Sequence, residues 1–193
     1  VATATASTTY EVANSCRFND GDSARLRLTP GSAATSSRKM TASFWCKRGS
    51  LGITGRIFSA DTSGSNNNRD SLFFNSDDEL WLYIDNGQAS NLKTIRVFRD
   101  PSAWYHIVLA IDTTQSTNTD RVKIYINGVQ ETSFSSSGDR IVYPDQNYDV
   151  LGYGQNGREA TIGADTDNGN SDNEWDGYLA EFVFIDGLAL APT

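Results

Sequence analysis

Residues 175–190 read Trp-Asp-Gly-Tyr-Leu-Ala-Glu-Phe-Val-Phe-Ile-Asp-Gly-Leu-Ala-Leu, and this stretch decides the fold. Its apolar run from Leu179 to Ile185 has an Asp-Gly turn pair on each side, and Glu181 is the only charged residue within it. A run of this length, rich in Phe, Val and Ile, predicts a strand buried on both faces. Such a strand lies inside a sheet, so the preceding chain is expected to supply the strands around it.

Short apolar segments separated by turn residues recur along the whole chain. The clearest hairpin is predicted over 121–134, where Asn127-Gly128 fits a two-residue type I′ turn because both positions need positive φ. A second hairpin is predicted over 71–84. No amphipathic helix of ten residues or more is found. About a dozen short strands in 193 residues predict one all-β domain, an antiparallel two-sheet jelly-roll sandwich.

The first residues differ in composition from the rest. Residues 1–12 are mostly Ala, Thr and Ser and lack the bulky apolar side chains that a core needs. We expect them to form an extended arm or linker, with the jelly-roll domain over 13–193. Because the chain begins at Val1 without Met, it is expected to be a processed product, a domain of a longer chain, or an ordered part of one.

The charge of the chain restricts its partners. The net charge is −8 and the pI is near 4.6, so binding to nucleic acid or to an anionic membrane surface is not expected. No apolar stretch approaches the length of a membrane-spanning helix. An acidic surface rich in Asn and Asp suits calcium or neutral sugars, with simple solubility as the alternative. Two cysteines leave open either a Cys16–Cys46 disulfide or a reduced, buried Cys46.

Several short motifs follow one another in an order that resembles a known superfamily. They are Phe18-Asn19-Asp20-Gly21, Ser43-Phe44-Trp45, Trp104-Tyr105-His106-Ile107-Val108, Tyr125-Ile126-Asn127-Gly128-Val129, Ile162-Gly163 and Gly177-Tyr178-Leu179-Ala180-Glu181-Phe182. Together they resemble the laminin-G-like or concanavalin A-like lectin/glucanase superfamily over roughly residues 14–190. The resemblance implies two stacked antiparallel sheets, with loops at one rim or a concave face available to ligands.

A narrower resemblance points to bacteriophage virion proteins. It rests on Trp45-Cys46-Lys47-Arg48-Gly49, on residues 99–106 and on residues 184–193. Similar modules occur in tail fibres, spikes and head decorations. This implies a structural and adhesion module at the virion surface, which contacts other virion proteins or its own longer chain. A surface glycan as ligand, a homo-oligomeric state and a secreted, extracellular location all remain open.

The acids that glycoside hydrolysis requires do not fall into the expected pattern. In the glucanase branch of the superfamily that this chain resembles, the acids lie on one strand as Glu-x-Asp-x-x-Glu. The nearest match in this sequence is Glu174-Trp175-Asp176. The third acid would fall at Leu179, and Glu181 lies on the opposite face of a strand from Asp176. His106, the single histidine, excludes a two-histidine zinc site and is expected to be structural. We therefore predict a protein that is not an enzyme, with a polysaccharide hydrolase as the least favoured alternative.

A polar, acidic loop is predicted over 165–174 as a candidate calcium site. Calcium prefers oxygen ligands from Asp, Asn and Glu on a flexible loop. The candidate ligands are Asp165, Asp167, Asn168, Asp172 and Glu174. Asn19-Asp20-Gly21-Asp22 is a second candidate. The alternative for both is that clusters of Asp, Asn and Gly simply form turns.

Aromatic residues near loops or on alternating strand faces are candidates for stacking on a sugar. They are Trp81, Tyr83, Tyr143, Tyr148, Tyr153 and Trp175. Trp45 and Trp104 are expected in the core instead. The alternative for every candidate is packing within the sandwich, which is the commoner use of aromatic side chains. The alternative function is that of a calcium-dependent carbohydrate-binding lectin domain, with calcium in the rim.

Overall fold

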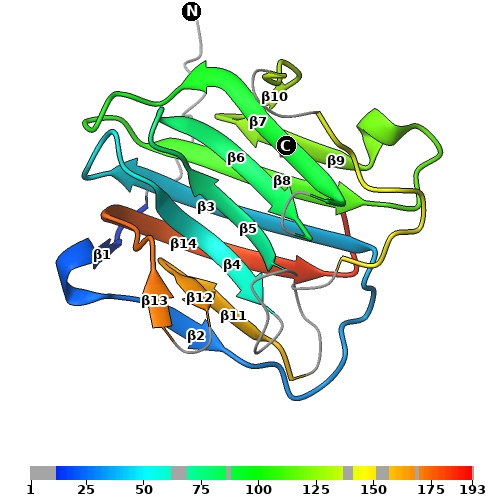
Figure 1. Cartoon of the computed structure of the whole chain (residues 1–193), viewed down its shortest axis with the longest axis horizontal. Helices are drawn as coiled ribbons and strands as arrows, with labels where there is room; N and C mark the ends of the chain where they lie inside the picture. The colour runs from blue at the N-terminus through cyan, green and yellow to red at the C-terminus, as the bar shows by residue number, and fades with distance from the viewer. Residues whose placement is uncertain are drawn as a thin grey trace, which may run out of the picture.

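Two antiparallel six-stranded sheets, stacked as a sandwich, make up the domain (Figure 1). The computed structural model describes residues 12–61, 69–85, 88–136, 141–150, 157–167 and 170–192. Helix in these residues is limited to two single 3-10 turns, η1 (Asp20–Asp22) and η2 (Asn118–Asp120), and none of it could cross a membrane. The predicted all-β, two-sheet fold is therefore confirmed.

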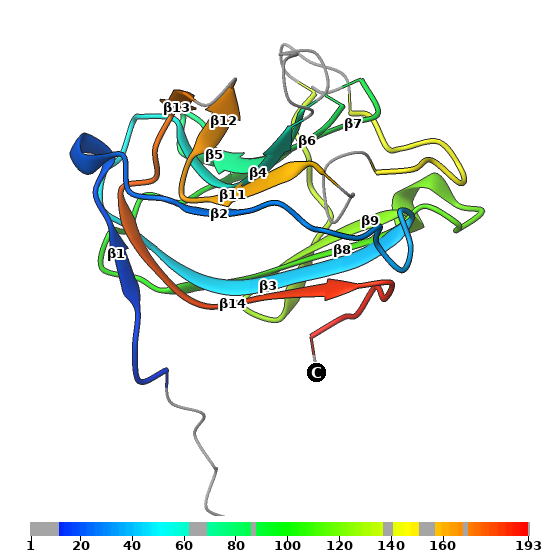
Figure 2. The same ribbon diagram turned by 90° about the horizontal axis from the view of Figure 1, so that it is seen from below.

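The first sheet, sheet A, has the strand order β1-β14-β3-β8-β9-β10. Its strands are β1 (Cys16–Phe18), β14 (Gly177–Asp186), β3 (Lys39–Arg48), β8 (Tyr105–Asp112), β9 (Val122–Ile126) and β10 (Val129–Glu131). Figure 2 shows this sheet edge-on as the lower layer, and the C-terminal end of the chain emerges on its outer side.

The second sheet, sheet B, has the order β2-β11-β4-β5-β6-β7 and forms the upper layer in Figure 2. Its strands are β2 (Leu26–Leu28), β11 (Glu159–Ile162), β4 (Gly55–Asp61), β5 (Arg69–Phe74), β6 (Glu79–Ile84) and β7 (Ser90–Val97). A separate two-stranded hairpin, β12 (Asp165–Asp167) and β13 (Asn170–Asp172), rises beside the outer face of sheet B.

The core lies between the sheets because alternate side chains of each strand point inward. In β3, Ala42, Phe44 and Cys46 are fully buried, and in β6 Leu80 and Leu82 are fully buried. The residues that alternate with them, such as Ser43 and Trp45 in β3 and Trp81 and Tyr83 in β6, are partly exposed. The outer faces of the two sheets therefore present side chains to the surroundings.

The strand predicted from the apolar run Leu179–Ile185 is only partly as expected. β14 does lie inside a sheet, between β1 and β3. Burial on both faces is wrong, however, because Tyr178 and Val183 are 38% and 48% exposed. A bulge follows Ala180, where Glu181 has a φ of 51°. The long apolar run thus covers the core with one face and leaves aromatic and aliphatic side chains on the outer face of sheet A.

Both predicted hairpins are confirmed. β5 pairs with β6, and β9 pairs with β10 through Asn127 and Gly128, whose φ angles of 51° and 80° are those of a type I′ turn. The predicted loop 165–174 instead contains the β12–β13 hairpin. The two cysteines are free thiols. Cys16 in β1 and Cys46 in β3 both pair with Leu179, one on each side of β14. The two cysteines are therefore two strand spacings apart, which is farther than a disulfide can span.

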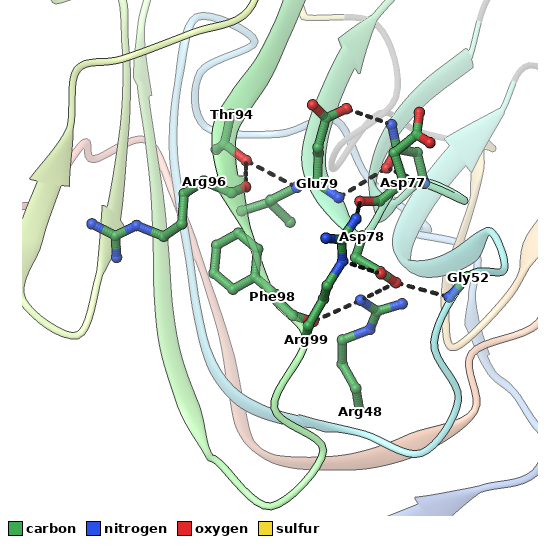
Figure 3. Close-up of polar contacts among 11 residues, drawn as sticks. Arg48, Gly52, Asp77, Asp78, Glu79, Thr94, Arg96, Phe98 and Arg99 are labelled. Atoms are coloured by element: carbon green, nitrogen blue, oxygen red, sulfur yellow. Dashed lines mark hydrogen bonds and ion pairs between the residues drawn. The ribbon is translucent and has the colours of Figure 1, made fainter.

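Asp78, in the turn between β5 and β6, is the centre of a buried polar cluster (Figure 3). Its Oδ1 accepts hydrogen bonds from Arg48 Nη1 and the Gly52 backbone N–H, both at 2.8 Å, and its Oδ2 accepts one from Arg99 Nε at 2.9 Å. Its main-chain carbonyl accepts from the Phe98 N–H at 2.8 Å. Asp78 therefore ties the ends of β3 and β7 to the start of β6.

The charge of Asp78 is what makes this cluster stable. Arg48 is almost completely buried, and its guanidinium also lies 4.8 Å from the centre of the Phe74 ring. Burial alone would raise the pKa of the Asp78 carboxyl, but the hydrogen bonds it accepts outweigh burial and lower this pKa. Because the folded-state pKa lies below the unfolded value of about 3.9, the stabilisation is complete above that pH and is lost as pH falls through the folded-state pKa.

Replacing Asp78 with Asn should therefore lower the free energy of unfolding at pH 7 by about 3 kcal/mol, because Arg48 stays buried without its counter-charge. Asp78→Asn should also show a smaller further loss of stability between pH 7 and pH 3 than the wild type. Urea unfolding followed by tryptophan fluorescence measures both quantities.

Asp77→Asn is the matched control, because Asp77 is exposed in the same turn and only its main-chain carbonyl accepts a hydrogen bond, from Arg99. It should change the free energy of unfolding by less than about 0.5 kcal/mol. Equal losses in the two variants would show that the buried carboxylate has no special role.

Candidate functional site: the outer face of sheet B

A row of four directly opposed residues crosses the outer face of sheet B. The register pairs Arg56 of β4 with Phe73 of β5, Phe73 with Trp81 of β6, and Trp81 with Lys93 of β7. Directly opposed residues share a face of the sheet and bring their side chains into contact. We call these four residues the sheet B row.

The side chains of the sheet B row are stacked against one another. The Arg56 guanidinium lies 4.5 Å from the centre of the Phe73 ring, and the Phe73 and Trp81 rings stack at 5.5 Å with an interplanar angle of 26°. Lys93 Nζ lies 4.7 Å from the centre of the Trp81 ring. The two cations thus enclose two aromatic rings, an arrangement stabilised by cation–π attraction at both ends.

Each cation of the row has an acidic partner. Arg56 Nε lies 2.9 Å from Asp165 Oδ2, which also pairs with Arg69. At the other end, Lys93 Nζ lies 3.7 Å from Glu79 Oε2. The Asp165 side chain is fully buried, and its Oδ1 has no hydrogen-bond partner among the described residues. The acids keep the row close to neutral although it contains two cations.

A second row lies beside the first and carries the polar groups nearest to solvent. Tyr83 opposes Asn91 in the register. The indole N–H of Trp81 donates to Asn91 Oδ1 at 2.7 Å, and the Tyr83 ring packs edge-on against Trp81 at 4.7 Å. Trp81, Tyr83, Asn91 and Lys93 are all partly exposed. This face therefore combines aromatic surface with amide, amine and hydroxyl groups.

Two of the six predicted aromatic candidates come together on this face, namely Trp81 and Tyr83. Trp175 does not join them: its side chain is 2% exposed and stacks on Phe74 at 5.7 Å in the core, so it offers no face to a ligand. Its position follows from Gly55, on whose backbone the indole lies. Tyr153 lies outside the described residues.

The other two candidates, Tyr143 and Tyr148, are partly buried and pack against the core. The Tyr143 ring lies edge-on to Phe134 at 6.4 Å. Burial, reinforced by the nearby carboxylates of Asp85 and Asp70, raises the pKa of Tyr148 to about 12. Neither tyrosine belongs to the two rows.

Arg56, Phe73, Asn91 and Lys93 were not among the residues predicted from the sequence to form a site. Alternation along each strand predicts which face of the sheet each side chain occupies. Which residues of neighbouring strands lie opposite one another depends on the pairing register, which the alternation does not give. Two β-bulges, in the β4–β5 and β6–β7 pairings, shift that register. Thr94 Oγ1 accepts from the Leu80 N–H at 3.1 Å beside the second bulge. Bulges of this kind leave little signal in a single sequence.

Only some of the predicted calcium ligands lie among the described residues. No group of three or more His, Cys, Asp or Glu side chains that could hold a metal ion occurs in the described parts of the chain. Asp165 is held by Arg56 and Arg69, and Glu174 Oε1 accepts a hydrogen bond from Ser23 Oγ at 3.2 Å. Asn168 and the side chains of Asp167 and Asp172 lie outside the described residues. In the second candidate, Asp20 and Asp22 form η1.

The sequence of the chain matches the model of a known protein family. The Laminin_G_3 model, described as the concanavalin A-like lectin/glucanases superfamily, matches residues 20–192. The chain belongs to this superfamily. No curated protein sequence gave a significant match.

Solved structures similar to this laminin-G-like domain share its fold. The pentraxin of Limulus polyphemus superposes with a TM-score of 0.59 at 22% identity, covering 86% of this chain and 71% of the pentraxin chain. Domain 4 of an extracellular arabinanase of Geobacillus stearothermophilus superposes with a TM-score of 0.58 at 20% identity. This match covers 86% of this chain and 68% of the arabinanase domain. The NanB sialidase of Streptococcus pneumoniae gives 0.59 at 17% identity; the match covers 92% of this domain but only 26% of the sialidase.

Asp165→Asn should reduce the free energy of unfolding by about 3 kcal/mol, because Arg56 and Arg69 would then lack their shared carboxylate in a buried position. It should also shift the tryptophan emission maximum, since Arg56 stacks on Phe73 and Phe73 stacks on Trp81. Urea unfolding and emission spectra test this pair of effects.

Glu159→Gln provides the comparison, because Glu159 of β11 pairs with Arg27 of β2, at a place in sheet B nearer to solvent than Asp165. A surface pair of this kind contributes less than about 1 kcal/mol. If Glu159→Gln were as destabilising as Asp165→Asn, the buried ion pairs would not be what holds the sheet B row.

Proposed function

We propose that this domain is a non-catalytic adhesion module that binds glycans on the outer face of sheet B. The observation that carries the proposal is the convergence of Trp81 and Tyr83 with Asn91 and Lys93 on one partly exposed surface. Aromatic surface that packs on the C–H groups of a sugar ring, beside a few polar groups that bind hydroxyls, is the usual composition of a saccharide site.

The packing of the sheet B row limits how a sugar would be bound. Phe73 is buried between Arg56 and Trp81, so its ring supports the site without contacting the ligand. The sugar would contact the exposed parts of Trp81 and Tyr83. The Asn91 amide and the Lys93 amine would bind its hydroxyl groups. The buried ion pairs would keep these side chains in place before the ligand arrives, which reduces the ordering cost of binding.

Two of the similar structures carry an oligosaccharide, which supports the class of ligand. Domain 4 of the arabinanase is in complex with arabinotriose. The CBM40 module of a Ruminococcus gnavus sialidase is bound to α2,3 sialyllactose and superposes with a TM-score of 0.52 at 12% identity. At these identities the structures support the fold and a class of function; the particular sugar follows from neither of them.

The adhesion role is proposed for a phage particle, in keeping with the motifs that resemble virion modules. The two ends of the described chain support such an orientation. Residues 12–15 line one groove with Trp45 of β3 and Trp104, directly before β8, and the Thr41 hydroxyl of β3 accepts a hydrogen bond from the Leu190 N–H at 2.8 Å. We infer that residues 1–12 contact neighbouring virion proteins while the sandwich is presented outward.

The absence of catalysis is also a proposal, supported by the state of the nearest acid pair. A glycosidase needs one carboxyl with a raised pKa to act as the general acid. Burial would raise the pKa of Asp176, but hydrogen bonds from Ser50 and Arg17 outweigh it and lower that pKa. Trp175, between Glu174 and Asp176, is buried in the core. The alternative of a calcium-dependent lectin rests on the 165–174 segment and predicts that a chelator abolishes sugar binding.

Trp81→Ala and Tyr83→Ala should each weaken glycan binding by about tenfold or more, because each removes aromatic surface from the centre of the site. The measurement is a glycan array with labelled protein, followed by calorimetric titration of the best oligosaccharide. Val129→Ala, which shortens an apolar side chain exposed on the β9–β10 hairpin, should leave the affinity unchanged.

Three results of this experiment would contradict the proposal or part of it. Unchanged binding by both aromatic variants would move the site elsewhere, and loss of binding in a chelator would favour the calcium-dependent lectin. Turnover of a polysaccharide that is lost in Glu174→Gln would show an enzyme. Detection of the chain on purified phage particles tests the proposed location separately.

A further inference from the structure

A groove on the opposite side of the molecule carries a second set of exposed aromatic residues. It lies on the outer face of sheet A, has a volume of about 300 Å³, and is lined by residues 12–15, Trp45 and Trp104. Both tryptophans were expected in the core. Instead Trp45 is only partly buried on the outward side of β3, and Trp104, directly before β8, is 36% exposed.

Each indole is held in place by an aromatic neighbour. The Trp45 ring stacks on His106 at 4.9 Å with an interplanar angle of 28°. His106 Nε2 is in turn hydrogen-bonded to Ser43 Oγ at 3.0 Å. Trp104 lies 6.4 Å from the Tyr178 ring, over which Arg17 is placed at 5.3 Å. The rings are therefore positioned by contacts outside the groove, and both indoles also line the groove.

The polar groups of the groove are those that bind neutral hydroxyls. Asn14 supplies an amide and Ser15 a hydroxyl, and both residues are exposed. No charged side chain lines the groove among the described residues. Its volume is at the lower end of the range for small-ligand sites, which suits one or two sugar rings. An acidic or phosphorylated ligand would find no counter-charge there.

We propose that this groove is a second saccharide-binding site, which takes a neutral sugar between Trp45 and Trp104. The site does not depend on the sheet B site, since the two lie on outer faces of different sheets and share no residue. With both sites occupied, one domain would bind two glycan chains on opposite sides. Residues 12–15 form one wall, so the N-terminal segment helps to shape this site.

The experiment compares the wild type, Trp104→Ala, Trp81→Ala and the double variant on one array of neutral and acidic glycans. Trp104→Ala is preferred to a change at Trp45 because Trp104 is the more exposed of the two. Its replacement should therefore lower the free energy of unfolding less. We expect Trp104→Ala to remove a set of neutral glycans that Trp81→Ala retains, with affinity for these glycans falling about tenfold. Trp104→Phe, which keeps an aromatic face, should lose less.

Each contrary outcome is distinct. If Trp104→Ala retains every glycan, or if Trp81→Ala alone removes all of them, the second site is wrong and the sheet B proposal stands. If Trp104→Ala removes all binding and Trp81→Ala none, the sheet B proposal is wrong and the groove stands. If the wild type binds no glycan, both are wrong. If Trp104→Ala changes only self-association in sedimentation, the groove is a protein contact and the inference fails.

Discussion

The buried carboxylate of Asp78 is the interaction on which the rest of the structure depends. It neutralises Arg48, which has almost no contact with solvent, and it joins the ends of β3 and β7 to the start of β6. The β6–β7 hairpin that it anchors carries Trp81, Asn91 and Lys93. An ion pair in the interior thus fixes the strands from which the proposed glycan site is built on the surface. Desolvation offsets much of the net stabilisation from a buried pair of this kind, whereas removing one partner leaves the other charge buried and unpaired.

The two faces of the sandwich use aromatic residues differently. On sheet B, Phe73 and Trp81 stack on each other and each ring also has a cation over it, while Trp81 stays partly exposed. On sheet A, Trp45 and Trp104 line an open groove beside the N-terminal segment. The described chain ends also lie on the sheet A side. Both outer faces therefore present aromatic side chains, and the N-terminal residues 12–15 line the groove on sheet A.

The sequence predicted the fold class, both hairpins and the presence of β14 inside a sheet, because these depend on local alternation and turn residues. It did not predict the sheet B row, which depends on a register set by two β-bulges, nor the exposure of Trp104. It also placed Trp175 at a ligand surface, although this indole lies on Gly55 and fills the core. An aromatic residue looks the same in a sequence whether its ring faces inward or outward, and tertiary packing decides between them.

The most direct test of the account is a titration of the best array glycan into isotopically labelled protein, followed by amide and indole N–H chemical shifts. A glycan whose binding requires Trp81 should shift the signals of the Trp81 indole N–H and the Asn91 side-chain amide, which are hydrogen-bonded on the outer face of sheet B. The signals of the Asp78 cluster should stay in place, because that cluster is already formed. Shifts confined to the 157–176 region, with the Trp81 indole unmoved, would contradict the assignment of sheet B as the glycan-binding face.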